Sequence, residues 1–393
     1  MKHSTTTKAL ALAACLGLVV AACGDDEEEG GGTATATESA ETATASEPAT
    51  ETASASEPAT ETASATEAPT ASATEPATET ASAPSEPVCP SNIVIQTDWW
   101  PEIEHGGSYN LIGPDGTADA ETFVYSGPIQ PQYAVGGVET VEIRAGGDAV
   151  SFTPVSSLLQ TDDDIIFGYI NMSDVIKDSA TAPSVAVAKT LEGDPQMIMW
   201  DPTQLDITEP ADMAATGAQV LHFDGVAYID YMIAQGYITA DQSNPSYGGA
   251  PTEWIAQGGN FIQQGFASNE VYKYENEIEW KDGAPADVEY FTVKDLGIDN
   301  YAATMAVRAD RIEELTPCLE VFVPAMQQAW IDYLADPVAM TDALIAINDT
   351  YDTYWKISAP LNAAGLAVLA EEGMDANSPD GTYCSFDEGR VQG

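Results

Sequence analysis

The sequence predicts an α/β protein whose folded part, residues 89–393, is divided into two lobes. Short apolar runs typical of strands alternate with glycine-containing turns and helical stretches, which predicts strand–turn–helix–strand units and hence parallel sheets. The folded part is also longer than most single domains. A hydrophobic content of 44% is sufficient for a real core.

The charge of the chain excludes one broad class of protein. There are 63 acidic and 12 basic residues, with a formal net charge of -51. Binding to nucleic acid needs a basic surface, which this chain cannot build, and electrostatic docking on anionic lipid is disfavoured for the same reason. The three histidines are His3, His105 and His222, too few for a His-rich zinc site. We expect neither a metal nor a cofactor.

Residues 1–22 have the pattern of a lipoprotein signal peptide. A basic start is followed by an apolar run, Ala9–Ala22, which is too short to span a bilayer. The run ends in Val20-Ala21-Ala22-Cys23, which looks like a bacterial lipobox, so we expect Cys23 to carry the lipid anchor on the extracytoplasmic face of a bacterial cell membrane. The alternative is an ordinary secretory signal followed by a chance cysteine.

Residues 23–88 form a low-complexity segment of Ala, Thr, Ser, Glu and Pro. The ten residues 46–55, SEPATETASA, are repeated identically at 56–65. Because no repeat contains a large apolar side chain, the segment has nothing to bury and is predicted to be a disordered linker. Its function would be to hold the folded part away from the membrane.

Three cysteines follow the anchor and permit one disulfide. Export favours a disulfide, and we expect Cys318 to pair with Cys384. Cys89, beside the linker, is the alternative partner.

The first lobe is predicted from three strands at 92–97, 138–144 and 165–170, with a helix at 151–159. Polar and aromatic residues follow each strand, and the carboxyl ends of parallel strands are where open α/β sheets bind ligands. Since neighbouring side chains on an extended chain point to opposite faces, we expect one of the two adjacent tryptophans in a cleft and the other in the core. The candidate ligand-binding residues here are Asp98, Trp99, Trp100, His105, Gly146, Gly147, Asn171, Ser173 and Asp174.

The second half begins with further strands at 184–188, 197–200, 219–223 and 288–293, and a helix at 226–235 that Gly236 ends. Three C-terminal helices follow, at 308–315, 319–334 and 341–354, with loops near Pro317 and Pro337. The candidate ligand-binding residues in this half are Trp200, Asp224, Asn260, Glu270 and Tyr272.

Several candidates have an equally simple structural role. His105 could brace its loop, and Gly146 with Gly147 could form an ordinary tight turn. Asp174 and Asp224 could each cap a helix. His222 lies in an apolar strand, and we expect it in the core.

Seven segments, taken in their order along the chain, are IVIQTDWWPEIEHGGSY, EIRAGGDAVSF, DDDIIFGYINMSDVI, GDPQMIMW, DGVAYIDYMIAQGYI, QGFASNEVYKYENE and VFVPAMQQAWIDYLADP. Together they resemble the NMT1/THI5-like solute-binding proteins over most of residues 93–340. The resemblance implies a two-lobed periplasmic-binding-protein-like (type II) fold with a two-strand hinge. It also implies a solute held in the interlobe cleft and delivered to the permease of an ABC transporter. We place lobe one at 89–184 plus 296–393 and lobe two at 185–295.

Members of this family bind thiamine pyrimidine precursors, riboflavin-like compounds, nitrate, sulfonates or taurine, and one branch makes the pyrimidine. Two departures stand out: residues 111–138 look like a rebuilt loop, and the Cys-rich iron-binding run of the synthase branch is absent. We therefore expect a binding protein, a monomer, rather than an enzyme.

The candidate residues are acidic and aromatic, and only Arg144 and Lys273 lie near them in the sequence. This set favours a flat nitrogen heterocycle, such as a thiamine pyrimidine precursor, as the solute. Three alternatives remain: an anion-binding protein for nitrate, sulfonate or taurine, a pyrimidine-forming enzyme, and a surface adhesin.

Overall fold

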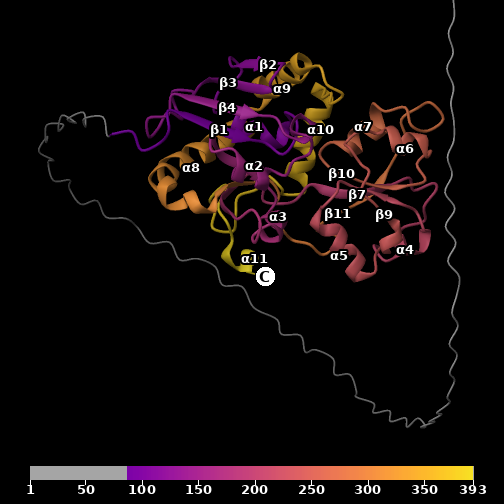
Figure 1. The fold of residues 1–393 in the computed structure, drawn as a ribbon. Coiled ribbons are helices and arrows are strands. Elements are labelled where there is room, and N and C mark those ends of the chain that lie inside the picture. Colours follow the sequence, from indigo (N-terminus) through magenta and orange to yellow (C-terminus); the bar gives the residue numbers. More distant parts are fainter. Residues whose placement is uncertain (1–85, 393) are drawn as a thin grey trace, which may run out of the picture. The chain divides into compact units, whose positions relative to one another are not determined.

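The computed structural model describes residues 86–392, which form two α/β lobes, each built around one β-sheet (Figure 1). The predictions for the signal peptide, for Cys23 and for most of the linker lie outside the described residues. No helix within residues 86–392 combines the length and the apolar character needed to cross a membrane.

The first lobe contains a seven-stranded mixed sheet. Its order is β2 (Thr117–Asp119), β3 (Val124–Pro128), β4 (Thr140–Arg144), β1 (Asn92–Gln96), β5 (Ile165–Ile170), β12 (Thr304–Arg308) and β6 (Ser184–Lys189). The centre is parallel, since β1 pairs in parallel with both β4 and β5. In this sheet the parallel arrangement expected from the sequence is confined to the centre, because β3 and β12 are both antiparallel to their neighbours.

The second lobe contains a five-stranded mixed sheet. Its order is β11 (Glu289–Thr292), β7 (Gln196–Trp200), β10 (Ile262–Phe266), β8 (Val220–Leu221) and β9 (Ser243–Asn244). The chain passes to this sheet between β6 and β7 and returns between β11 and β12, so two segments, residues 190–195 and 293–303, connect the lobes.

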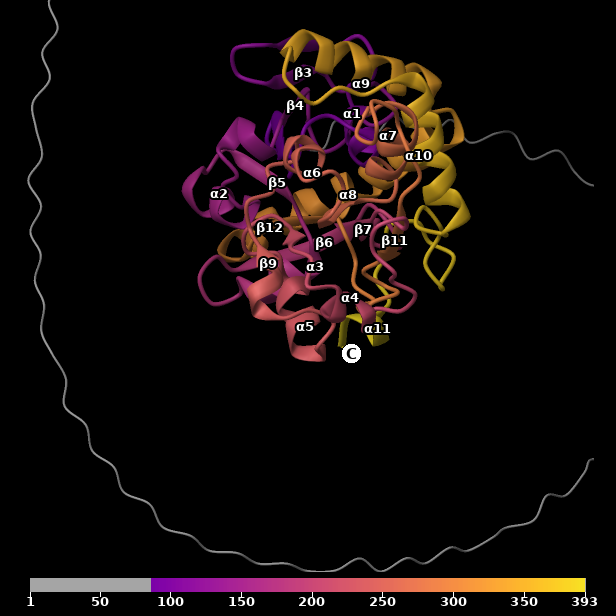
Figure 2. The same ribbon diagram turned by 90° about the vertical axis from the view of Figure 1, so that its right-hand side faces the viewer.

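Helices surround each sheet; the two groups are seen apart in Figure 1, and in Figure 2 the helices of the second lobe lie in front of the first lobe. The helices that follow strands of the first sheet are α1 (Gly106–Tyr109), α2 (Val155–Thr161), α3 (Met172–Lys177), α8 (Ile312–Ala335), α9 (Val338–Tyr351), α10 (Ala359–Glu371) and α11 (Glu388–Gln392). Those around the second sheet are α4 (Asp212–Thr216), α5 (Ala227–Gln235), α6 (Thr252–Ala256) and α7 (Glu270–Asn276). The described residues also contain four short 3-10 turns: η1 (Ile103–His105), η2 (Gly147–Val150), η3 (Ala240–Gln242) and η4 (Ala309–Arg311).

The burial of side chains explains why the strands form where they do. All six residues of β5 and all five of β7 are buried, as in central strands that are covered on both faces. Helix α5 ends at Gly236, whose φ of 76° is the left-handed conformation that glycine adopts without strain. This end was expected from the sequence.

Three expectations about the elements are wrong. The predicted loop near Pro317 is absent, because α8 continues through Pro317 and Pro324. Burial of the apolar face of α8, including Leu315 and Phe322, compensates for the hydrogen bonds that proline removes. The strand β6 pairs with β12 in the first sheet, although residues 185–189 were assigned to lobe two. Within the rebuilt loop, β2 and β3 form a hairpin that extends the first sheet.

The expected disulfide is also wrong. Cys318 pairs with Cys89, and Cys384 is a buried free thiol. The reason lies in the packing: residues just before β1 lie against α8, where Gly136 approaches both Cys89 and Val321. The disulfide therefore fastens the start of the folded part to the longest helix.

Candidate functional site

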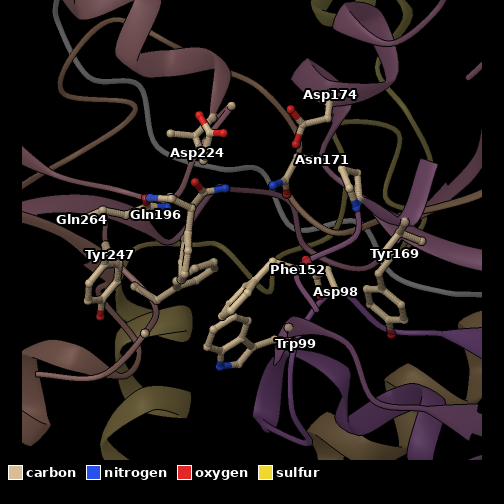
Figure 3. Close-up of a pocket in the computed structure, with 18 of the residues that line it drawn as sticks. Asp98, Trp99, Phe152, Tyr169, Asn171, Asp174, Gln196, Asp224, Tyr247 and Gln264 are labelled. Carbon is tan, nitrogen blue, oxygen red and sulfur yellow. The ribbon is translucent and has the colours of Figure 1, made fainter. Parts of the chain in front are cut away.

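A cavity of about 610 Å³ lies between the two lobes and is lined by residues of both (Figure 3). In Figure 3, Asp98, Trp99, Phe152, Asn171 and Asp174 of the first lobe face residues of the second lobe. The second-lobe residues labelled there are Gln196, Asp224, Tyr247 and Gln264. An interlobe cavity of this size suits a small solute.

The sheet edge of the first lobe supplies one wall. Asp98 and Trp99 follow β1, Gly147 follows β4, and Asn171 and Asp174 follow β5, so parallel neighbouring strands bring them to one place. Seven of the sequence-predicted candidates line the cavity: Asp98, Trp99, Gly147, Asn171, Asp174, Asp224 and Glu270.

The two adjacent tryptophans separate as the alternation of side chains predicts. Trp99 lines the cavity, whereas Trp100 is 1% exposed and packs edge-on against Phe123, with Tyr351 close by. Trp100 is therefore a core residue and not a cleft residue. Trp200 is corrected in the same way: it is buried in the second lobe, where its ring contacts Phe291.

His105 does not line the cavity but holds a residue that does. It is 1% exposed, and its Nε2 lies 2.8 Å from Oδ1 of Asp98, while its ring packs edge-on against Tyr169. Gly146 also lies behind the cavity wall. A Cβ atom there would be 2.3 Å from the carbonyl oxygen of Thr97, so the backbone approach requires glycine.

The remaining candidates lie elsewhere. Asn260 is exposed in a turn and donates a hydrogen bond to the carbonyl oxygen of Gln257. Tyr272 is partly buried against the core of the first lobe, and Ser173 does not line the cavity either. His222 is buried, as expected, and is bonded to Ser243 and to the carbonyl oxygen of Phe223. Burial lowers the pKa of its imidazole.

Aromatic side chains from both lobes meet inside the cavity. The Trp99 ring lies 5.2 Å from Phe223 of the second lobe, 6.2 Å from Phe152 and 5.5 Å from Trp355. The Phe223 ring is in turn 5.0 Å from Tyr247. These contacts join the lobes and give the cavity an apolar wall against which a flat ring can stack.

The ionisable groups of the cavity are almost all acidic. Lys177 is its single basic side chain among the described residues, and it is already bonded to Oδ1 of Asp174 at 3.0 Å and to the carbonyl oxygen of Gly225 at 2.6 Å. Burial raises the pKa of the carboxyl groups of Asp174, Glu102 and Glu270. The carboxylates that line the cavity are Asp98, Glu102, Asp174, Asp178, Asp224 and Glu270.

Several lining residues were not predicted from the sequence. Phe223 directly precedes Asp224 after a strand, and the same strand-end argument could have found it. Tyr247 and Trp355 come from loops without any such signal, and Phe152 lies in a turn with φ of 56°. Gln264 is held in place by accepting a hydrogen bond from the backbone amide of Phe223 at 2.8 Å.

No group of three or more His, Cys, Asp or Glu side chains within residues 86–392 has an arrangement that could hold a metal ion.

Comparison with known proteins agrees with the resemblance seen in the sequence. A family model described as NMT1/THI5 like matches residues 136–340. No curated protein matches the chain.

Among solved structures, the chain is similar to the periplasmic aliphatic sulphonate binding protein SsuA from Escherichia coli, with 12% identity and a TM-score of 0.47 over 71% of this chain and 84% of that chain. It is also similar to the alkanesulfonate-binding protein SsuA from Xanthomonas axonopodis pv. citri, with 11% identity and a TM-score of 0.43; the match covers 71% of this chain and 84% of that chain. A third similar structure is the ligand-binding component of an ABC-type import system from Staphylococcus aureus, with 11% identity and a TM-score of 0.41; the match covers 76% of this chain and 98% of that chain.

Proposed function

This chain belongs to the NMT1/THI5-like family, and from that premise we propose that it is the solute-binding lipoprotein of an ABC importer. The two lobes close on a small solute and present it to a permease. Cys23 carries the anchor, and residues 23–88 give the folded part its reach from the membrane.

The proposed solute is a small, flat nitrogen heterocycle that carries an amine or a positive charge, such as a thiamine pyrimidine precursor. The observation that carries this proposal is the lining of the cavity: aromatic rings from both lobes stand beside six carboxylates, and the one lysine is already bonded. Aromatic faces attract flat and cationic groups, and carboxylates accept hydrogen bonds from amines.

The same lining disfavours an anion such as nitrate or a sulfonate. An anion would enter a cavity of negative charge and would have to compete with Asp174 for Lys177. Binding sites for such anions ordinarily supply several donors or a free positive group.

Within the cavity, Trp99 is the proposed stacking platform. Its ring contacts Phe152 on its own lobe and Phe223 on the other, so a solute stacked on it would touch both lobes at once. Such a solute would favour the closed arrangement, because it gains contacts that the open arrangement lacks.

A thermal-shift panel tests the solute class. The full chain carrying Cys23→Ser is heated with the thiamine pyrimidine, thiamine, riboflavin, taurine and nitrate in turn. A solute at ~100 times its Kd stabilises the fold by ~2.7 kcal/mol, which is readily measured as a higher Tm. We expect the amine-bearing heterocycles to raise Tm. A rise with taurine or nitrate alone would refute the proposed class.

The variant Trp99→Ala tests the stacking platform. Stacking of a base on an aromatic side chain contributes about 1–3 kcal/mol, so a heterocycle should bind roughly 5- to 150-fold more weakly to the variant. The matched control is Trp99→Phe, which keeps an aromatic face. Equal affinities of the wild type and Trp99→Ala would remove the stacking role.

A further inference from the structure

Glu102 is a cavity residue that was not among the candidates expected from the sequence. Glu102 follows Trp100 and Pro101 and directly precedes the 3-10 turn η1. Its side chain is only 7% exposed, and it lines the cavity between the lobes.

The carboxylate of Glu102 has no partner. Among residues 86–392 no hydrogen bond or ion pair reaches it, and it forms no cap on η1. Its neighbour Glu104 differs, because Oε1 of Glu104 is bonded to Ser268 and its Oε2 is enclosed by protein. Neither oxygen of Glu102 is enclosed in this way. A buried carboxylate that faces a cavity without a partner is costly unless something in the cavity binds it.

Glu270 faces the same cavity from the other lobe. It is 6% exposed, and it is fixed at the start of α7 because its Oε2 accepts a hydrogen bond from the backbone amide of Phe266 at 2.7 Å. Its Oε1 lies 3.4 Å from the hydroxyl of Tyr247. Burial, Glu104, Asp98 and Glu270 all act to raise the pKa of Glu102.

One cation, Lys273, lies near this pair, and its charge acts to lower the pKa of both carboxyl groups. Nζ of Lys273 lies 3.8 Å from the ring centre of Trp355, and it forms no ion pair among the described residues. Burial lowers the pKa of Lys273. Two acidic side chains from opposite lobes thus line one cavity, and the lysine near them forms an ion pair with neither. Like charges that face one cavity repel each other.

We propose that Glu102 and Glu270 together form the subsite for a planar cation with two N–H donors, of the amidinium or aminopyrimidinium class. A carboxylate binds such a group through two parallel hydrogen bonds. The cation would sit between the lobes and offset the repulsion that closure creates, so that the lobes close on a cationic solute in preference to a neutral one. This inference rests on the proposed function, since it names the group by which that solute is held.

The test is the affinity of the full chain for two probes of one shape, benzamidine, which is an amidinium, and benzamide, which is neutral. Calorimetry is carried out with the Cys23→Ser chain, with E102Q and with E104Q in the same background. Hydrogen bonds to charged groups predict that the wild-type chain binds benzamidine about 10- to 100-fold more tightly than benzamide. E102Q should reduce that ratio to near one.

E104Q is the matched control, because Glu104 is equally buried but does not line the cavity. We expect E104Q to retain the preference for benzamidine over benzamide. This holds even if the variant closes less readily and therefore binds both probes more weakly. The near-isosteric change in E102Q removes an unpartnered buried acid, so its Tm should not fall.

Two results would overturn the inference: a wild-type chain without preference for benzamidine, or an E102Q variant that keeps the preference. If the thiamine pyrimidine raises Tm in the panel above while either result is found, the proposed function stands and only this subsite fails. If anions alone raise Tm, the proposed function fails as well.

Discussion

Breaking the Cys89–Cys318 disulfide is the perturbation with the largest expected effect on stability. The bond joins residues that are 229 apart in sequence, so it closes a very long loop in the unfolded chain. The loop-entropy relation gives roughly 5 kcal/mol for a loop of this length, and removal of native disulfides usually costs about 2–5 kcal/mol. We therefore expect a loss of about 2–5 kcal/mol in the free energy of unfolding.

The assay is urea unfolding of the Cys23→Ser chain, compared with the same chain carrying Cys89→Ala and Cys318→Ala together. The midpoint of the variant should fall, and dithiothreitol should lower the wild-type midpoint but leave that of the variant unchanged. Cys384→Ala is the control, because this buried thiol forms no disulfide and its loss should cost only about 1 kcal/mol. If Cys384→Ala is the more damaging change, or dithiothreitol has no effect on the wild type, the reasoning is refuted.

Two further predictions concern pH and lobe closure. Burial raises the pKa of Asp194 to about 6, so its proton is bound more tightly in the folded chain, and stability should decline by up to about 3 kcal/mol as the pH rises from about 4 to above 6. Asp194→Asn should remove this decline in urea titrations at several pH values; identical pH profiles of the two chains would contradict the assignment. Gly365→Ala should weaken closure by about 1–3 kcal/mol, because its Cβ would lie 2.4 Å from the carbonyl oxygen of Ser268 and 2.5 Å from Cδ1 of Ile103. We expect the Gly365→Ala variant to bind the thiamine pyrimidine more weakly and to be more open in small-angle X-ray scattering. If scattering and affinity are both unchanged, the structure accommodates the added methyl group and the prediction is wrong.

Seven of the twelve strands in the described residues were predicted, because short apolar runs of sequence indicate buried strands, whereas β2, β3, β9, β10 and β12 were not predicted. The run 165–170 is wholly apolar apart from Gly168 and Tyr169, and it forms β5 with the same bounds. The separation of Trp99 and Trp100 also followed from local geometry alone. Residues at strand ends therefore gave one wall of the cavity.

The rest depends on contacts between distant parts of the chain. Trp355 reaches the cavity from a loop after α9, and Tyr247 from a loop after β9, so no local pattern marks either residue. Pro317 predicts a helix end by its own chemistry, but packing of α8 overrides it. The sequence analysis did not include Glu102 among the candidates, because its burial depends on contacts that only the fold shows.

Arg390 bonds to both segments that connect the lobes, residues 190–195 and 293–303. Its Nη1 donates to the carbonyl oxygen of Glu192 at 2.7 Å, and its Nη2 donates to that of Asn300 at 2.6 Å. Its guanidinium also lies 3.9 Å from the ring centre of Tyr301. A single side chain thus bonds to both connecting segments, so bending at one segment also involves the other as long as these hydrogen bonds hold. Arg390 does not itself line the cavity, so a residue outside the solute site helps to hold the segments that connect the lobes.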